Sequence, residues 1–265
     1  MTIAIIGAGT MGQALIGGLL AQRHARRSLR AADTNASTRA AVARRFRIPV
    51  SADAAAAARG AEVVLLAVKP QQFEAVVGTI RPAVDRRQLV VSIAAGITTR
   101  WLERRLPAGT PVMRVMPNLP ATVGSGFSAI TAGRRATPRH RAVVRALFGA
   151  VGEVVELPER SFDAITAASG SGPAYVFFLV QIWEDAARRL GLPAHVASRA
   201  IQATLAGSVR LLQVSGGPAE VLVKRVASKG GTTEAALRVL ADRRVAAAFA
   251  EALRAAAHRS KALSR

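Results

Sequence analysis

The chain of 265 residues contains no cysteine, and its four histidines are scattered. Without cysteine the protein forms neither a disulfide bond nor a thiolate metal site. The histidines are never spaced as a metal-binding pair, so we expect no metal site and disfavour a zinc hydrolase; they are His24, His140, His195 and His258. The lack of cysteine agrees with a reducing compartment, and we expect the protein to be cytoplasmic.

Aromatic residues and lysines are also few. Phe, Trp and Tyr make up 4% of the chain, and only Lys69, Lys224, Lys229 and Lys261 are lysines among 37 basic residues, which outnumber 16 acidic ones and leave a formal net charge of +21. Such a charge would ordinarily suggest nucleic acid or an anionic membrane as a partner. The arginines, however, are spread along the chain between alanines, and few rings are available to stack bases. We therefore interpret most of the charge as solvated helix faces and expect neither partner.

Residues 1–22 carry no charged side chain, a property shared with membrane spans and signal peptides. The first arginines follow this apolar run, whereas a signal peptide begins with them. The β-branched run Ile3–Ile6 leads into I-G-A-G-T-M-G at 6–12. We therefore predict a strand, a glycine turn and a helix from Thr10, which is the context that the G-x-G-x-x-G motif requires.

This motif predicts a dinucleotide site. Gly7 would allow the tight turn, Gly9 would let the backbone approach a pyrophosphate, and Gly12 would let the helix pack closely on the strand. The amides at the start of the helix would then face the phosphates at the positive end of the helix dipole.

The identity of the dinucleotide stays open. A second strand, 29–32, ends in Asp33, which lies 21 residues beyond Gly12 and near the position of a ribose-binding acid. Asp33 favours NAD, because its carboxylate would repel a 2′-phosphate. Four nearby side chains could instead bind that phosphate, namely Thr34, Asn35, Ser37 and Arg39.

The organisation changes near Pro158. A hydrophobic content of 51% excludes disorder, and 265 residues predict one large domain or two modest ones. Apolar strand-like runs at 63–68, 89–93, 112–115, 127–131 and 154–157 alternate with helical stretches, among them the alanine-rich run 52–59. After Pro158 only helical patterns remain, at 161–190, 194–214, 219–226, 232–241 and 244–263. We therefore predict an α/β fold in which 1–158 form a Rossmann-type, doubly wound, mostly parallel sheet and 159–265 form an all-helical domain.

Several helices of the second half are apolar around much of their circumference, as at 174–183. A small bundle can hardly bury all of that surface by itself, so we expect intertwined dimerisation. A well-buried monomeric bundle is the alternative.

The stretch 226–237, V-A-S-K-G-G-T-T-E-A-A-L, is the most informative one outside the nucleotide motif. Two glycines flanked by hydroxyls open directly into a helix, which makes a backbone nest suited to a carboxylate or a phosphate. An ordinary helix capped by Thr232 or Thr233 explains the same residues equally well.

Six motifs together resemble one family. They are I-G-A-G-T-M-G at 6–12, A-V-K-P at 67–70, S-I-A-A-G-I at 92–97, R-V-M-P-N-L-P at 114–120, S-G-S-G-P-A-Y at 169–175 and S-K-G-G-T-T at 228–233. Their order and spacing resemble those of pyrroline-5-carboxylate reductase over nearly the whole chain. The last motif is the most specific, whereas the nucleotide motif is shared by many dehydrogenases.

The resemblance implies NAD(P)H-dependent reduction of Δ1-pyrroline-5-carboxylate to L-proline, with NADPH as the expected cofactor and NADH as a second possibility. It implies a homodimer through the helical domain and a larger ring of dimers, up to a decamer. The implied cofactor residues are Ile6, Gly7, Ala8, Gly9, Thr10, Met11, Gly12, Asp33, Thr34, Ala67, Val68, Lys69, Pro70 and Asn118, the last near the nicotinamide. The implied substrate residues are Ser228, Gly230, Gly231, Thr232 and Thr233, with the Thr233 hydroxyl beside the ring nitrogen as the catalytic group.

Three positions depart from the family pattern or vary within it. Lys229 stands where proline is also common, and we interpret it as a tolerated variant because an exposed lysine lacks the burial of a Schiff-base lysine. Ser51 and Asp53 stand where an asparagine often lies near the adenosine, and 213–217 lack a glutamate found in some members.

Two other functions are alternatives for this sequence. A related two-domain imine or 3-hydroxyacid oxidoreductase would often use a lysine or aspartate in the first long helix of its helical domain. In this chain the only acids of that helix beyond the S-G-S-G-P-A-Y motif are Glu184 and Asp185, well past the motif. A basic nucleotide-sensing or nucleic-acid-binding protein would use the +21 charge, but would leave the 228–233 nest without a purpose.

Overall fold

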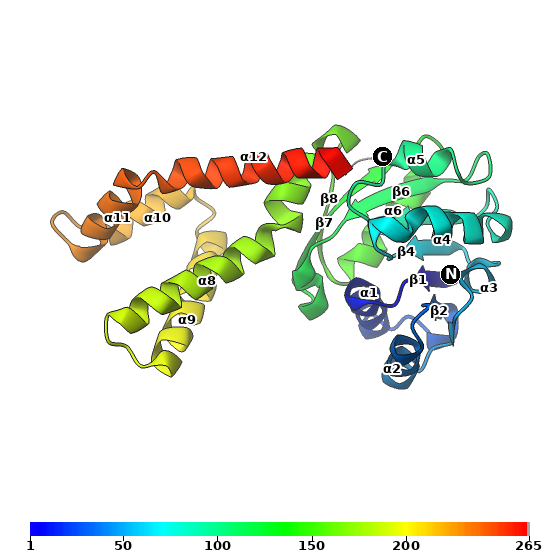
Figure 1. Ribbon diagram of the computed structural model, residues 1–265, viewed down its shortest axis with the longest axis horizontal. Coiled ribbons are helices and arrows are strands. Elements are labelled where there is room, and N and C mark those ends of the chain that lie inside the picture. Colours follow the sequence, from blue (N-terminus) through cyan, green and yellow to red (C-terminus); the bar gives the residue numbers. More distant parts are fainter. Residues whose placement is uncertain (264–265) are drawn as a thin grey trace. The chain divides into compact units, whose positions relative to one another are not determined.

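The computed structural model describes residues 1–263, and the chain divides into two compact units (Figure 1). The α/β unit comprises residues 1–173 together with the segment that starts at Ala255, and the helical unit comprises Ala174–Arg254. The chain therefore leaves the α/β unit once and returns to it.

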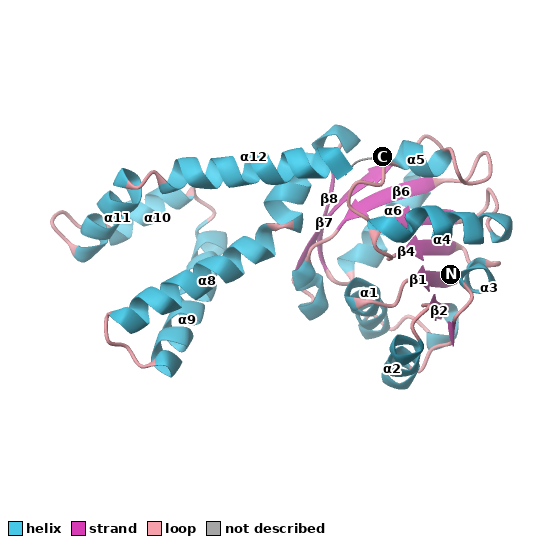
Figure 2. Ribbon diagram, viewed as in Figure 1, coloured by secondary structure: helices cyan, strands magenta, loops and turns pink. Residues whose placement is uncertain are grey.

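One eight-stranded sheet forms the centre of the α/β unit (Figure 2). Its strands are β1 (Ile3–Ile6), β2 (Leu29–Ala32), β3 (Val50–Ser51), β4 (Val63–Leu66), β5 (Leu89–Ser92), β6 (Val112–Met116), β7 (Gly126–Ala132) and β8 (Gly152–Glu156). Their order in the sheet is β3-β2-β1-β4-β5-β6-β7-β8. All pairs are parallel except β6 and β7. The order reverses at β1, and in sheets of this kind dinucleotides bind across the carboxyl ends of the strands at that point.

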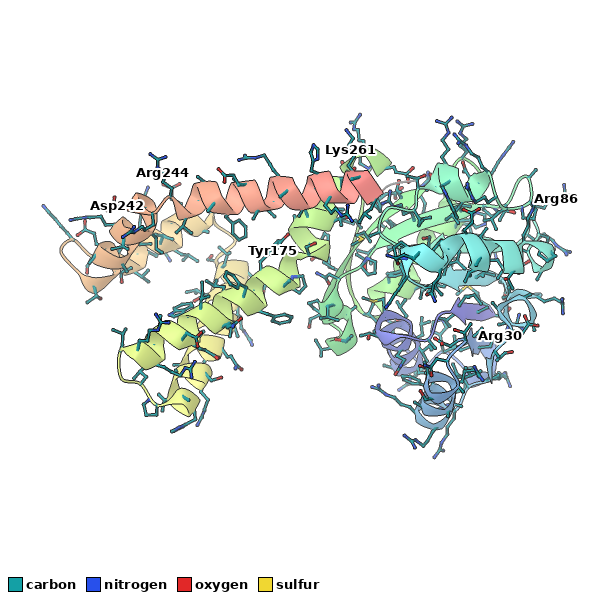
Figure 3. The ribbon with its side chains drawn as sticks, viewed as in Figure 1. Arg30, Arg86, Tyr175, Asp242, Arg244 and Lys261 are labelled. Atoms are coloured by element: carbon teal, nitrogen blue, oxygen red, sulfur yellow. The ribbon has the colours of Figure 1, made fainter. Side chains whose placement is uncertain are left out.

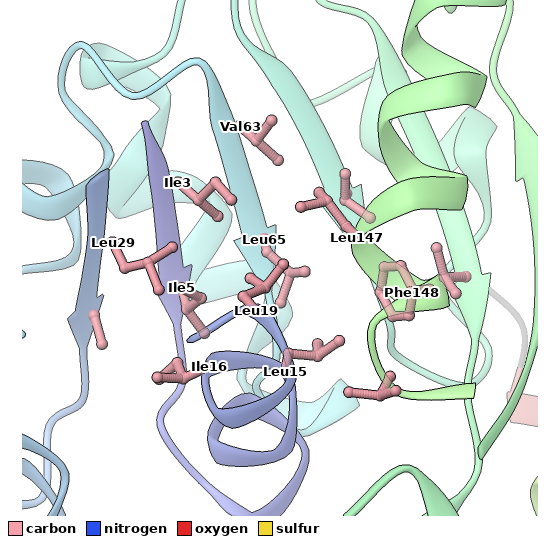
Figure 4. Close-up of a cluster of buried hydrophobic side chains, with 14 of the residues drawn as sticks. Ile3, Ile5, Leu15, Ile16, Leu19, Leu29, Val63, Leu65, Leu147 and Phe148 are labelled. Atoms are coloured by element: carbon pink, nitrogen blue, oxygen red, sulfur yellow. The ribbon is translucent and has the colours of Figure 1, made fainter. Parts of the chain in front are cut away.

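Helices cover both faces of this sheet, as the sequence predicted. They are α1 (Thr10–Ala21), α2 (Ala36–Phe46), α3 (Ala54–Ala58), α4 (Phe73–Ile80), α5 (Thr99–Glu103) and α6 (Pro138–Gly149). Because side chains alternate across a strand, Ile3 and Ile5 join the core under α1 and α6, whereas Ala4 and Ile6 join the core under α3 and α4. Figure 4 shows the first core, in which Leu15 of α1 and Phe148 of α6 meet the strands.

Past β8 the described residues form no further strand. The short helix α7 (Phe162–Ile165) continues through a π-helical turn, Thr166–Gly170, into α8 (Gly172–Arg189). It is followed by α9 (Ala194–Ser215), α10 (Ala219–Val226), α11 (Thr232–Asp242) and α12 (Val245–Leu263). The end of α12 belongs to the α/β unit, where Ser260 Oγ donates to Asp163 Oδ1 at 2.7 Å.

The helical unit has almost no core of its own. Within 174–254, all described, only Ala197 and Ile201 are buried. Large apolar side chains on α8 are exposed, among them Val176, Phe177, Phe178, Leu179, Ile182 and Trp183. A self-contained, well-buried bundle, the alternative to dimerisation, is therefore wrong for this chain. By length and composition alone the run Glu159–Arg189 could also cross a membrane, and 6% of its most apolar window is buried.

The basic side chains are dispersed over both units (Figure 3). Arg86 and Arg244, both exposed, lie in the α/β unit and the helical unit respectively. Several arginines pair with nearby carboxylates, as in the pairs Arg87–Asp85 and Arg188–Asp185. This distribution agrees with solvated surfaces, as interpreted from the sequence.

Candidate functional site

The glycine loop after β1 has the geometry that its sequence predicts. Gly7 has φ +97°, and a Cβ there would lie 2.6 Å from the Ala67 carbonyl oxygen. A Cβ on Gly12 would collide with the Gly7 carbonyl oxygen, so helix and turn need glycine for close packing. Around Gly9, by contrast, nothing lies within 4 Å of the Cβ position. The loop is thus closed against the protein at two glycines and open at the third, where a pyrophosphate would approach.

The start of α1 supplies unpaired donors to this open side. Gly9 is the N-cap and provides no side-chain cap. The first helical bond runs from Gln13 N to Gly9 O, so the amides of Thr10, Met11 and Gly12 precede the helical ladder. Within residues 1–263 none of these three amides donates a hydrogen bond. Free amides at the positive end of a helix dipole are suited to an anion such as phosphate.

A cavity of about 210 Å³ adjoins the loop and extends toward β2. It contains most of the cofactor residues expected from the sequence, namely Ile6, Gly7, Gly9, Asp33, Thr34, Ala67, Val68 and Lys69. Five other expected cofactor residues are next to the lining residues in the sequence but do not line the cavity, namely Ala8, Thr10, Met11, Gly12 and Pro70. The lining also includes residues that were not expected as cofactor residues, namely Ala32, Ala52, Ala54, Gln72 and Val76.

Both carboxylate oxygens of Asp33 accept backbone hydrogen bonds. Oδ2 accepts from Ala8 N at 2.9 Å, and Oδ1 accepts from Asn35 N at 2.8 Å. Asp33 therefore ties the glycine loop to the turn after β2. Next to it, Arg39 Nη1 donates to the carbonyls of Asp33 and Thr34 at 3.0 and 2.9 Å, which places a cation at this turn.

Two polar side chains around the cavity have structural partners. Asp53 Oδ1 accepts from Ala55 N and Ala56 N and so caps α3, which engages this oxygen at the position where family members often have an asparagine. Gln72 Oε1 accepts from Lys69 N at 3.3 Å, closing the turn Pro70–Gln72 after β4. In a capping box, a Glu or Gln stands three positions after the N-cap residue. Gln72 stands three positions after Lys69, and this spacing could have identified it from the sequence.

Asn118 lies two residues beyond β6, at the carboxyl edge of the sheet shared with the glycine loop. Its Oδ1 accepts from Phe127 N at 2.8 Å, and its Nδ2 donates to Ser169 Oγ at 3.1 Å. The following short helix, Leu119–Val123, packs on α1. The sequence indicated Asn118 but not its partner Ser169.

The loop expected to bind the substrate lies in the helical unit, at the start of α11. Its N-cap is Gly231, without a side-chain cap, so capping by Thr232 or Thr233, the alternative weighed from the sequence, is wrong. Gly231 lies tightly against Ser228, since a Cβ on Gly231 would be 2.5 Å from Ser228 Oγ. The first helical bond is Ala235 N to Gly231 O, which leaves the amides of Thr232, Thr233 and Glu234 without acceptors among the described residues.

One acid already occupies part of this nest. Glu234 Oε2 accepts from Gly230 N at 2.6 Å, and Gly230 has φ +73°. Lys229 is exposed, which agrees with its interpretation as a tolerated variant. The loop therefore combines three free amides with the half-exposed Thr233 side chain, an arrangement suited to a small carboxylate that also needs one hydrogen-bond donor.

Comparison with family models gives two matches. Residues 159–263 match the family described as pyrroline-5-carboxylate reductase dimerisation. Residues 2–96 match the family described as NADP oxidoreductase, coenzyme F420-dependent.

Individual proteins match over nearly the whole chain. The pyrroline-5-carboxylate reductase of Pseudomonas aeruginosa is 43% identical over 264 residues, covering 99% of this chain and 96% of the relative. The solved pyrroline-5-carboxylate reductase of Coxiella burnetii has a TM-score of 0.91 at 30% identity, over 100% and 98% of the two chains. The pyrroline carboxylate reductase of Plasmodium falciparum, solved with NADP bound, has a TM-score of 0.91 at 26% identity, also over 100% and 98% of the two chains.

Proposed function

The chain belongs to the pyrroline-5-carboxylate reductase family, and on this premise we propose how its residues reduce Δ1-pyrroline-5-carboxylate to L-proline with NADPH. A single feature carries the proposal. One chain holds two glycine loops that each present free helix-start amides, one at Thr10–Gly12 and one at Thr232–Glu234. The first suits a pyrophosphate and the second suits a small carboxylate.

The residues of the α/β unit fit a dinucleotide. The open space at Gly9 and the free amides of α1 would hold the pyrophosphate, and the cavity beside Asp33 and Thr34 would hold the adenosine half. When bound, NADPH supplies the hydride. Because both oxygens of Asp33 are engaged by the loop and Arg39 lies beside it, we infer that the turn tolerates a 2′-phosphate, which favours NADPH over NADH.

The helical unit would bind and orient the imine. The amides of Thr232, Thr233 and Glu234 would hold the substrate carboxylate, with Ser228 and the two glycines shaping the loop. The Thr233 hydroxyl would donate to the ring nitrogen, where electron density arrives as hydride reaches the adjacent carbon. A cyclic imine held about 3–3.5 Å from the hydride donor needs little further acid catalysis.

We also infer the assembly and the location. The exposed apolar face of α8 and the match to a dimerisation family support a homodimer through the helical unit. A second copy of the chain, rather than a membrane, would then cover the run Glu159–Arg189. A ring of dimers, up to a decamer, in the cytoplasm completes the proposal.

Turnover tests this assignment. Purified protein should oxidise NADPH only when Δ1-pyrroline-5-carboxylate is added, and L-proline should appear in equal amount. Reactions without imine, or with a 3-hydroxyacid and NADP⁺, are the controls. Turnover of the hydroxyacid without turnover of the imine would assign the protein to the 3-hydroxyacid oxidoreductases. No turnover of the imine with either NADPH or NADH would refute the reductase assignment.

A further inference from the structure

The side chain of Asn118 is held from two elements. Phe127 N, at the start of β7, can only donate, so the oxygen of the Asn118 carboxamide must face it. The amide nitrogen must then face Ser169 Oγ, 3.1 Å away. These two bonds fix the orientation of the Asn118 carboxamide without reference to any ligand.

Ser169 lies in a backbone segment of an uncommon kind. The π-helical turn Thr166–Gly170 interrupts the helical run between α7 and α8, and such turns are frequent at functional sites. Gly170 in the same turn packs against Met116 at the end of β6, so closely that a Cβ would collide with the methionine methyl group. The π-helical turn therefore contacts the end of β6, two residues before Asn118.

The position of Asn118 in the sheet indicates which half of a dinucleotide it would meet. Strands β1, β4, β5 and β6 are parallel, so their carboxyl ends share one edge. The cavity beside Asp33 occupies the β2 side of the glycine loop. The other half of the cofactor then extends past α1 toward β4, β5 and β6, where Asn118 stands.

We propose that Ser169 is a positioning residue for hydride transfer: its hydroxyl accepts from Asn118 Nδ2 and holds the carboxamide in the orientation that contacts the nicotinamide half of the cofactor. The inference rests on the proposed reductase function. Ser169 acts through Asn118 and does not touch the reacting atoms. Without the hydroxyl, one N–H of Asn118 loses its acceptor and the carboxamide can rotate, and small misplacements of a reacting group lower transfer rates.

A double-mutant cycle tests the pair. Ser169→Ala should lower kcat about three- to tenfold, the range that one neutral hydrogen bond supplies. Ser169→Thr, which keeps a hydroxyl, should restore most of the rate. In an Asn118→Ala background the Ser169→Ala change should have almost no further effect. Thr122→Val is the matched control, because Thr122 Oγ1 donates only to Leu119 O in the turn that follows Asn118.

Two further measurements separate positioning from folding. The kinetic isotope effect with NADPH deuterated at the transferred position should rise in Ser169→Ala, because hydride transfer becomes slower relative to product release. The urea midpoint of unfolding should stay close to that of the wild type. Three outcomes would each overturn the proposal. They are a full further loss of kcat when Ser169→Ala is added to Asn118→Ala, a loss of kcat in Thr122→Val equal to that in Ser169→Ala, and an isotope effect that does not change.

The outcome is distinguishable from failure of the proposed function. Wild-type turnover of the imine decides the function, whereas the comparison among variants decides the role of Ser169. If the wild type has no turnover, the Kd of NADPH is measured from the fluorescence of NADPH for the wild type, the two single variants and the double variant. Independent effects of the two substitutions on that Kd would refute the coupling.

Discussion

The guanidinium of Arg114, on β6, lies 3.3 Å from Glu159 Oε1 with 3% of its side chain exposed. It also stacks 4.6 Å above the Phe162 ring, and within residues 1–263 its Nε and Nη2 have no hydrogen-bond partner. Burial lowers the pKa of Arg114, while Glu159 opposes that effect. Glu159 further accepts from Thr99 N and Oγ1 at 2.8 and 2.7 Å. This pair joins the sheet to the segment that leads toward α8.

Glu159→Gln should destabilise the protein, because it removes the carboxylate that forms the ion pair with the buried Arg114 and leaves only the weaker interaction with Asp163. The expected loss in free energy of unfolding is roughly 2–3 kcal/mol, measured by urea denaturation. Asp85→Asn, which breaks the exposed Arg87–Asp85 pair, is the control and should change the midpoint by no measurable amount. Equal effects of both substitutions would show that burial of Arg114 does not matter.

Thr233→Val should lower kcat/KM far more than Thr232→Val, by about a hundredfold against less than threefold. The first change removes the proposed donor to the ring nitrogen, and loss of one such donor typically costs about 10²–10³ in rate. The second removes a hydroxyl from an exposed side chain of the same turn. Far-ultraviolet circular dichroism checks that both variants fold. Equal activities would mean that the donor has been misassigned.

Arg39→Ala should lower kcat/KM for NADPH about tenfold and leave the value for NADH nearly unchanged, as expected for loss of a charged hydrogen bond to a 2′-phosphate. Arg44→Ala, an exposed arginine on the same helix, is the control. Asp33→Ala should weaken both cofactors alike, because Asp33 fixes the glycine loop. A selective loss of NADH activity in Asp33→Ala would instead identify Asp33 as a ribose ligand.

Phe178→Asp should shift the protein from dimer toward monomer in size-exclusion chromatography with light scattering. Phe178 is 61% exposed on the apolar face of α8, and a buried carboxylate there would lack a partner. Val123→Asp places the same charge on an exposed apolar residue of the α/β unit and should leave the dimer intact. An unchanged mass of the Phe178→Asp protein would place the interface elsewhere.

Stability should fall as the pH drops below about 6.5, in part because of His140. Its Nδ1 accepts from Thr137 N at 3.0 Å, so protonation there removes the acceptor. Burial, and secondarily Arg139, lower the pKa of His140. At pH values between the lowered pKa of folded His140 and the ordinary pKa of about 6.5 in the unfolded chain, the unfolded chain therefore binds more protons. The free energy of unfolding consequently rises with pH across this range. Urea unfolding of His140→Gln at several pH values should give a smaller acid-induced loss than wild type, whereas His195→Gln, exposed, should follow the wild type.

Local patterns predicted the elements that form through local interactions. The strands at 29–32, 63–66 and 89–92 lie within the short strand and the apolar runs predicted at 29–32, 63–68 and 89–93, and the helix 219–226 begins after the predicted glycine and proline break. The strand β3, Val50–Ser51, was missed because two residues have no recognisable periodicity and become a strand only by pairing with β2.

Features that depend on distant residues could not be predicted. Ser169 lies 51 positions from Asn118 and takes its place only through the π-helical turn. Arg114 resembles any other arginine in a chain with 37 basic residues, and only the fold buries it. The glycine loops could be located from the sequence because closely spaced glycines next to a helix start form a local pattern, although Ala67 and Asp33 also pack on the first loop.

The helical unit is an insertion, since 174–254 lie between two segments of the α/β unit. It is therefore attached by two covalent connections, and the bond from Ser260 to Asp163 spans 97 positions of sequence. A protease that cuts once in the exposed turn at Gly216–Pro218 would release neither half, because each fragment would keep one end folded into the α/β unit. Such nicked protein would stay intact on a native gel and separate into two bands only after denaturation.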